Sequence, residues 1–187
     1  LSEIELTADG SHTLFVPSMN EHYHSVNGAK TEAEHIYINY GFKESCASPV
    51  NVLEIGFGTG LNAFLTLVET QKLQKQTVYT SLELYPLSQE VIEQLNYPSI
   101  IYPEFSNLYF DLHRAEWNKL CKISADFSLL KVNIDFTQIS QANESSKWKL
   151  GSIDNQSISY DVVYFDAFAP EKQPEMWNQD LFDAIYA

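Results

Sequence analysis

The segment from Val50 to Gly60 constrains the fold of this chain more than any other part. It reads V-N-V-L-E-I-G-F-G-T-G, an apolar run that leads into three glycines at every second position. An amphipathic stretch follows at once, with Leu61, Leu65 and Val68 on one helical face. Glycine leaves room for the close approach of a ligand, and the first N–H groups of a helix face the same space. The segment therefore predicts a binding site for a nucleotide-like cofactor.

The alternation of apolar strands and helical stretches continues to the end of the chain. We expect strands at 50–55, 78–84, 127–134 and 159–165, and helices at 61–73, 107–121 and from 175 onward. Strands separated by helices predict a mostly parallel sheet with helices on both faces. The fold class is therefore α/β and Rossmann-like, with the cofactor-binding core at residues 49–187.

Residues 1–48 are expected to form an N-terminal extension on the substrate side of this core. Asp9-Gly10 between two extended runs predicts a β-hairpin. The polar and aromatic stretch Asn20–Ser25 predicts a loop, and Thr31-x-x-Glu34 has the pattern of a capping box that begins a helix.

The composition of the chain argues against several classes of function. The 187 residues include 25 acidic and 11 basic side chains, a formal charge of −14, which argues against non-specific binding of nucleic acid. A nucleic acid held locally, or delivered by a partner, stays compatible with this charge. Cys46 and Cys121 have no metal-ligand spacing and are expected to be reduced thiols. No apolar run reaches the ~20 residues of a membrane span, so we expect a cytoplasmic protein.

Acidic residues stand at the expected carboxyl ends of the strands, where ligands bind in open α/β sheets. Glu54 precedes the glycines, and Glu83 is placed to accept hydrogen bonds from the hydroxyl groups of a ribose. Asp135 is a candidate for the amino group of an adenine. Asp166 follows the fourth strand, which flanks the point where strand order reverses, and is expected at the reactive end of the cofactor. An ordinary solvated strand end is the alternative for Glu83 and Asp135.

Aromatic and histidine side chains suggest a substrate pocket beside these acids. Phe168 and Trp177 lie close to Asp166 in the sequence and suit either the core or a pocket wall. Two histidines, His22 and His24, follow Glu21. Two histidines with one glutamate can suggest a metal, but no third ligand cluster is evident, so we predict a substrate-facing loop and no metal site.

These residues resemble one family closely. The pattern E-x-G-x-G-x-G resembles motif I of class I S-adenosylmethionine-dependent methyltransferases. D-G-S-x-T-L at Asp9–Leu14, E-H-Y-H-S at Glu21–Ser25, L-E-I-G-F-G-T-G-L-N-A-F-L at Leu53–Leu65 and F-D-A-F-A-P-E-K-Q-P-E-M-W at Phe165–Trp177 resemble the methyltransferase domain of bacterial MnmC-type enzymes. The last string is the most specific, and the match runs in order along nearly the whole chain.

The resemblance implies N-methylation of 5-aminomethyluridine, with or without a 2-thio group, at the wobble position of tRNA, to 5-methylaminomethyluridine. S-adenosyl-L-methionine is then the cofactor and tRNA the substrate, with Asp166 as the catalytic residue. Cofactor contacts are expected from Glu54, Gly56, Phe57, Gly58, Thr59, Gly60, Asn62, Glu83, Asp135 and Asp166. Substrate contacts are expected from His22, Tyr23, His24, Phe168, Pro170 and Trp177.

The family's flavin-binding oxidase domain is not recognisable in this sequence, so a separate oxidase or another wobble-uridine modification protein is an expected partner. The chain starts at Leu1 and stops within a helix-like pattern. We therefore expect further polypeptide to follow, with the C-terminal strands of the fold missing from this chain.

Two other functions stay open at the level of sequence. A polyamine-synthase-like aminopropyl transferase uses a similar fold and an acidic site, and the net charge of −14 suits its cationic substrate. A non-catalytic subunit that binds S-adenosylmethionine and assists tRNA modification is the second alternative. Product formation from S-adenosylmethionine, as against its decarboxylated form, separates these possibilities.

Overall fold

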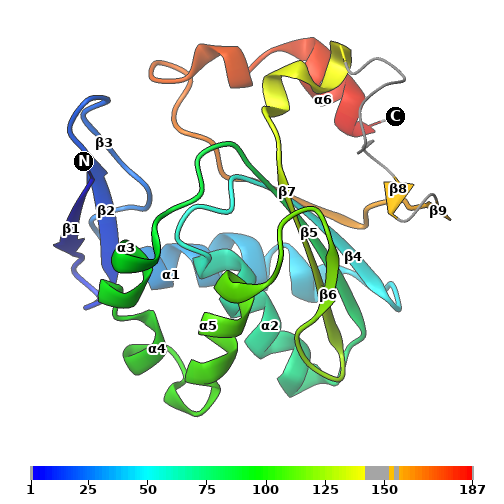
Figure 1. The fold of residues 1–187 in the computed structure, drawn as a ribbon, viewed down its shortest axis with the longest axis horizontal. Coiled ribbons are helices and arrows are strands. Elements are labelled where there is room, and N and C mark those ends of the chain that lie inside the picture. Colours follow the sequence, from blue (N-terminus) through cyan, green and yellow to red (C-terminus); the bar gives the residue numbers. More distant parts are fainter. Residues whose placement is uncertain (1, 142–151, 154–155, 187) are drawn as a thin grey trace.

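A central five-stranded sheet organises the molecule, for which a computed structural model describes residues 2–141, 152–153 and 156–186 (Figure 1). The strands lie in the order β10-β4-β5-β7-β6. Their bounds are β4 (Val50–Ile55), β5 (Thr77–Glu83), β6 (Leu120–Lys122), β7 (Phe127–Asn133) and β10 (Val162–Phe165). Four of these strands are parallel, and β6 runs antiparallel to β7. The predicted α/β fold with a mostly parallel sheet is confirmed.

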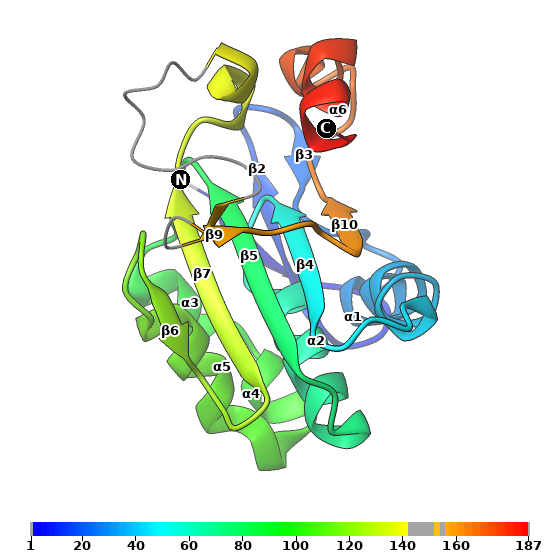
Figure 2. The same ribbon diagram turned by 90° about the vertical axis from the view of Figure 1, so that its right-hand side faces the viewer.

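Described helices lie against one face of this sheet and beyond the carboxyl ends of its strands (Figure 2). One face carries α2 (Leu61–Leu73), α3 (Gln89–Gln94), α4 (Tyr97–Ile100) and α5 (Ser106–Arg114). The short helices η4 (Phe136–Gln141) and η5 (Pro174–Met176) lie with α6 (Gln179–Tyr186) beyond the carboxyl ends of the strands, as Figure 2 shows for α6. Val52 packs in one apolar cluster and its neighbour Leu53 in the other, and both are fully buried. β4 is thus enclosed on both faces, which is typical of strands in parallel sheets.

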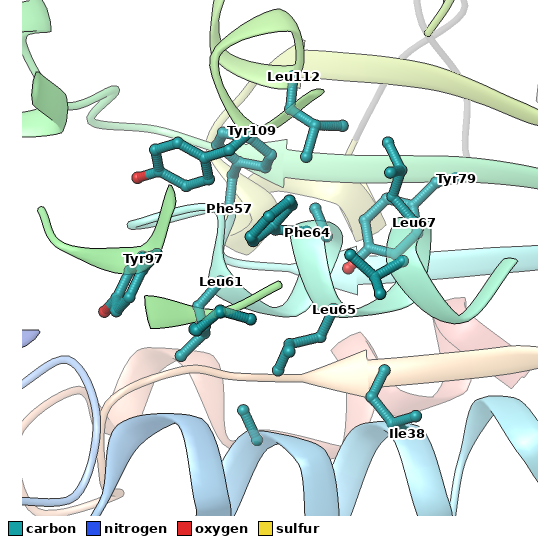
Figure 3. Packing of buried hydrophobic residues seen from close by; sticks show 14 of the residues in the cluster. Ile38, Phe57, Leu61, Phe64, Leu65, Leu67, Tyr79, Tyr97, Tyr109 and Leu112 are labelled. Atoms are coloured by element: carbon teal, nitrogen blue, oxygen red, sulfur yellow. The ribbon is translucent and has the colours of Figure 1, made fainter. Parts of the chain in front are cut away.

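The helix that follows the glycine turn is more deeply buried than predicted. Leu61, Phe64, Leu65 and Val68 form the expected apolar face, but Ala63 and Thr66 are fully buried too. Figure 3 shows the reason, since the aromatic rings of Tyr79, Tyr97 and Tyr109 and the side chain of Ile38 surround α2. Because α2 is held on all sides in this way, the turn that precedes it is fixed to the core.

The N-terminal extension forms a small sheet and a helical segment. The predicted hairpin is confirmed as β1 (Glu3–Leu6) and β2 (His12–Val16), which pair antiparallel. The stretch predicted as a loop contains a third strand, β3 (Glu21–His22), paired with β2. Next come α1 (Ala29–Ala33), the π-helix η1 (Glu34–Asn39) and the 3-10 helix η2 (Phe42–Glu44).

The predicted capping box is wrong. The helix begins at Ala29 rather than at Thr31, and the side chain that caps it comes from the hairpin turn. Asp9 accepts hydrogen bonds from the backbone N–H and the hydroxyl of Thr31, both at 2.8 Å. Glu34 instead lies 3.8 Å from Lys30 in an ion pair. The cap is therefore a long-range contact that the local pattern did not reveal.

The predicted helix at 107–121 is too long. It ends at Arg114, and the chain turns at Asn118, whose φ is 60° and whose N–H donates to the carbonyl of Lys131 at 2.6 Å. Residues 120–122 then pair with β7 as the edge strand β6. A strand of three residues is too short for its periodicity to be recognised.

Candidate active site

A cleft of about 440 Å³ opens at the carboxyl ends of β4, β5, β7 and β10. The turn after β4 contributes Gly56, Phe57, Gly58 and Thr59. The ends of the other strands contribute Glu83, Asp135 and Asp166, and the N-terminal sheet contributes the segment from Glu21 to His24. The cleft lies where β4 separates the strands on its two sides, at the predicted switch point.

The glycine turn is confined between two walls. Gly56 has φ 96°, and a Cβ on it would stand 2.9 Å from the backbone oxygen of Asp166. Gly58 has φ 48°, and a Cβ there would stand 3.0 Å from the ring of Tyr23. Both positions combine a left-handed backbone with a close neighbour, so side chains are excluded for two independent reasons.

Glu83 and Asp135 are fixed at the wall of the cleft by hydrogen bonds from the backbone. Glu83 accepts from the N–H of Gly58 at 2.9 Å and from the N–H of Tyr85 at 2.7 Å. Asp135 accepts from the N–H and the hydroxyl of Thr137 at 3.0 and 2.6 Å. The two oxygens of Glu83 and the Oδ2 of Asp135 each keep a further lone pair, so both side chains keep the capacity to accept from a ligand.

Asp166 is held by two donors from different elements. The amide of Asn62, on α2, donates to its Oδ2 at 2.7 Å, and the hydroxyl of Tyr37, on η1, forms a second hydrogen bond. Burial, the charge of Asp166 and this hydrogen bond raise the pKa of Tyr37 far above its usual value, so the phenol stays protonated. The carboxylate therefore has a defined orientation at the cleft.

The N-terminal sheet closes one side of the cleft with aromatic rings. The ring of Tyr23 meets that of Phe168 edge-on, with centroids 5.4 Å apart. Burial and the charge of Glu83 raise the pKa of Tyr23 to about 12. His24 bonds to the hydroxyl of Thr59 at 2.9 Å, and burial lowers its pKa although Asp166 and Glu32 oppose the shift. The imidazole of His24 is therefore neutral at pH 7.

His22 also lines the cleft, and its ring lies 3.0 Å from Glu5 of β1. Within the part of the chain that the structure describes, no three His, Cys, Asp or Glu side chains are grouped to hold a metal ion. No described helix is long and apolar enough to cross a membrane.

Four predicted site residues lie outside the lining of the cleft. Glu54 is fully buried beneath it, and Gly60 begins α2 close to His113. Pro170 is exposed, and Trp177 donates its indole N–H to the carbonyl of Phe168 at 2.8 Å. Their assignment to cofactor or substrate stays a prediction.

The cleft also contains residues that were not among the predicted site residues. These are Glu21, Ile55, Leu61, Leu82, Leu84, Tyr85, Ile134, Phe136, Thr137, Ala167, Ala169, Gln173, Glu175 and Met176. Tyr85 could have been predicted, because it stands two residues after Glu83, the acidic residue at the end of β5. Glu175 and Met176 belong to the string Phe165–Trp177 that carries the family resemblance, and the return of the chain after β10 brings them to the cleft.

The sequence and structure match known proteins. Residues 108–187 match the S-adenosyl-L-methionine-dependent methyltransferase family. A tRNA 5-methylaminomethyl-2-thiouridine biosynthesis bifunctional protein MnmC from Campylobacter fetus is 26% identical over 92% of this chain and 26% of its own length. The protein of the same name from Idiomarina loihiensis is 33% identical over 72% of this chain and 22% of its own length.

The crystal structure of MNMC2 from Aquifex aeolicus is similar to the whole fold. Its TM-score is 0.74 at 26% identity, and the match covers 100% of this chain and 55% of that chain. The chain spans about a quarter of the length of the curated relatives that it matches. The resemblance predicted from the sequence, to an MnmC-type methyltransferase domain that uses S-adenosyl-L-methionine, is confirmed.

Proposed function

We propose that this chain transfers a methyl group from S-adenosyl-L-methionine to the amine of 5-aminomethyluridine, with or without a 2-thio group, at the wobble position of tRNA. The observation that carries the proposal is the placement of Asp166, which two donors hold at the switch point of a cleft beside a glycine turn. The names of the matched relatives supply the substrate class.

The residues of the cleft fit this cofactor. Gly56 and Gly58 leave a cradle that a Cβ would fill, and Glu83 presents carboxylate oxygens suited to ribose hydroxyls. Asp135 is suited to the amino group of an adenine. When bound, S-adenosyl-L-methionine supplies an electrophilic methyl group on a cationic sulfonium.

The charge of the cleft favours cations. Its lining includes five carboxylates, those of Glu21, Glu83, Asp135, Asp166 and Glu175, and among the described residues that line it there is no lysine or arginine. A sulfonium and an alkylammonium group are both attracted by such a lining. The rings of Tyr23 and Phe168 can hold a base by stacking, which is worth roughly 1–3 kcal/mol per base in single-strand binding.

Asp166 orients the amine in this proposal rather than acting as a strong base. An alkylamine is protonated at neutral pH and must lose a proton before it can attack. A carboxylate beside an ammonium group raises the pKa of that group and so opposes the loss. Its contribution is positional, and correct placement of two reacting groups lowers a barrier by up to roughly 7–11 kcal/mol.

An acidic cleft does not hold the phosphates of tRNA. With a net charge of −14, the chain needs basic groups from elsewhere to bind the polyanion. A partner protein, such as a separate oxidase of the same modification, is one source. A cytoplasmic location accompanies the proposal.

The test is nucleoside mass spectrometry after incubation with S-adenosylmethionine and tRNA that carries 5-aminomethyluridine. The expected product is 5-methylaminomethyluridine. A parallel reaction with decarboxylated S-adenosylmethionine and putrescine tests the aminopropyl transferase alternative. Cofactor binding without any product would favour the non-catalytic subunit, and transfer to putrescine would overturn the proposal.

A further inference from the structure

Glu54 is the only acidic side chain among the described residues that is fully buried. It lies on β4 directly before the glycine turn, beneath the cleft rather than in its wall. The hydroxyl of Ser81 donates to its Oε2 at 2.5 Å, whereas its Oε1 has no hydrogen-bond partner. A buried carboxylate with half of its acceptors unused is costly, so the site needs an explanation.

Two more buried polar groups beside Glu54 also lack a hydrogen-bond partner. The side-chain oxygen of Asn62 and the hydroxyl of Tyr79 are both buried without a partner. Both residues lie within hydrogen-bonding reach of the Glu54 carboxyl group. The side-chain nitrogen of Asn62 already donates to Asp166 at 2.7 Å.

A count of donors and acceptors shows what is missing. An ionised carboxylate and an amide oxygen can only accept hydrogen bonds. With Glu54 ionised, its Oε1 and the oxygen of Asn62 are both buried acceptors without a donor. A proton on Oε1 provides a donor for the oxygen of Asn62, and the other oxygen of the carboxyl group still accepts from Ser81.

Burial favours a proton on Glu54. Glu54 is fully buried, whereas Asp166 faces the cleft. Burial raises the pKa of Glu54 well above its usual value, and the charge of Asp166 adds to the shift, whereas the hydrogen bond from Ser81 and the nearness of Tyr79 and Asn62 oppose it. The titratable groups that face Glu54 are Tyr79 on β5, Tyr164 and Asp166 at the end of β10, and Tyr37 on η1.

We infer that Glu54 is a neutral positioning residue, a carboxylic acid that fixes the amide of Asn62, which in turn holds the carboxylate of Asp166 at the cleft. This reading replaces direct contact with the cofactor, which the sequence alone suggested. The role of Asp166 in it rests on the proposed function, but the protonation of Glu54 does not.

Infrared difference spectroscopy tests the protonation without any substrate. We expect the carbonyl stretch of a protonated carboxyl group at pH 7 in the wild-type protein and its loss in Glu54→Gln. Glu83→Gln is the matched control, because Glu83 is another strand-end glutamate that lines the cleft, and it should keep the band. A wild-type spectrum without the band, or a band that survives in Glu54→Gln, would overturn the inference.

Turnover tests the positioning role. Glutamine has the shape of a neutral glutamic acid and can donate to Asn62, so Glu54→Gln should keep kcat within about threefold of wild type. Glu54→Ala removes the donor and should lower kcat by about tenfold or more with a smaller change in KM. Loss of cofactor affinity in Glu54→Gln would show that the ionised form contacts the cofactor, and would refute the inference.

The Asn62→Ala variant keeps the outcome interpretable if Glu54→Ala does not fold. It removes the link between the two carboxyl groups and should lower kcat to the same degree, while the infrared band of Glu54 persists. If the wild-type enzyme shows the band but no methyl transfer, the proposed function fails and the protonation of Glu54 stands.

Discussion

Asp166 is the residue on which turnover should depend most directly. In Asp166→Asn the amide of Asn62 still finds an oxygen to bond, but the negative charge that orients the substrate amine is lost. We expect kcat to fall on the order of 10²-fold, the scale of misplaced reacting groups, with cofactor affinity broadly kept. Calorimetry and nucleoside mass spectrometry measure the two effects separately. Turnover at the wild-type rate would remove Asp166 from the reacting end of the site.

Gly58 offers a second prediction, with Gly10 as its matched control. Both have positive φ, 48° and 85°, but a Cβ at Gly58 would meet the ring of Tyr23 whereas one at Gly10 meets nothing within 4 Å. Gly10→Ala should therefore cost only the backbone strain, roughly 1–2 kcal/mol in the free energy of unfolding. Gly58→Ala should cost more and should also weaken cofactor binding. Equal losses in urea denaturation and unchanged calorimetry would contradict this view of the turn.

The acidic residues that the sequence predicted for the site and that line the cleft share one property. Glu83, Asp135 and Asp166 each follow a strand that has a clear apolar pattern, so the topology alone brings them to one edge. Tyr37 could not be found in this way, because its hydrogen bond to Asp166 depends on the packing of a π-helix against the sheet. The unpartnered oxygens near Glu54 are likewise visible only in three dimensions.

At the scale of elements, Asp9 joins the hairpin to α1. Burial opposes its ionisation, but hydrogen bonds from Ser11, Thr31 and Thr7 outweigh it and hold the pKa of Asp9 far below 3.8. This stabilisation is present above pH 3.8 and is lost as the pH falls through the lower value of the folded state. Asp9→Ala should lower the free energy of unfolding by about 1–3 kcal/mol at pH 7 in urea denaturation.

Glu5→Ala, on the same hairpin, is the matched control for Asp9→Ala. Glu5 is exposed on β1, and its carboxylate meets only the ring of His22 among the described contacts. Glu5→Ala should change stability by less than about 1 kcal/mol, the usual limit of an exposed ion pair. If Asp9→Ala and Glu5→Ala lower the free energy of unfolding equally, Asp9 does not cap α1.

His113 connects α5 to the glycine turn by a hydrogen bond and makes the stability of the fold depend on pH. Burial and the charge of Lys131 lower its pKa from 6.5 to about 4, although its hydrogen bond to the carbonyl of Thr59 opposes the shift. Between pH 6.5 and 4 the unfolded chain binds a proton that the folded chain does not, so stability falls as the pH is lowered. The loss is on the order of 1–2 kcal/mol, because solvent partly reaches the ring.

Thermal melts of the wild type and of His113→Gln at pH 7 and pH 5 measure this effect. The melting temperature of His113→Gln should fall less between pH 7 and pH 5 than that of the wild type. The carboxylates that titrate in this range are common to both proteins, so their contribution cancels in the comparison. Identical losses would mean that His113 is as accessible to protons in the folded protein as in the unfolded one.

The elements with long, regular patterns were predictable and the short ones were not. The strand, turn and helix from Val50 to Leu73 were correct because apolar runs, glycines and helical spacing agree there. The strands β3 and β6, of two and three residues, exist only because a neighbouring strand pairs with them. The cap from Asp9 was missed for the same reason, since its partner Thr31 is far away in the sequence.

At the scale of the whole molecule, cofactor binding should stabilise the fold, because the cleft is built from four strand ends at once. A ligand at 100 times its Kd adds about 2.7 kcal/mol to the free energy of unfolding, which raises the melting temperature by roughly 5–10 °C for a chain of this size. Glu83→Ala should weaken the binding of S-adenosylmethionine by about 1.5–3 kcal/mol and abolish most of the increase in melting temperature. Glu93→Ala, at an exposed site on α3, serves as the control.

The order of the sheet followed from general rules, whereas the composition of the cleft did not. Alternating strands and helices with right-handed crossovers imply parallel pairing and a switch point beside β4. The N-terminal sheet and the segment after β10 are separated by more than a hundred residues, yet Tyr23 and Phe168 meet across the same cleft. Contacts of that range depend on the complete three-dimensional packing.

The contact of the Tyr23 ring with the backbone at Gly58 has a consequence for the engineering of this protein. A truncation that starts at Val50 would keep every parallel strand and the glycine turn, and would still resemble a minimal nucleoside-binding unit. It would nevertheless expose the bound nucleoside to bulk water along one entire flank. The first forty-nine residues are therefore expected to govern how long the ligand resides, in addition to the contacts that Ile38 and Phe42 make in the apolar core.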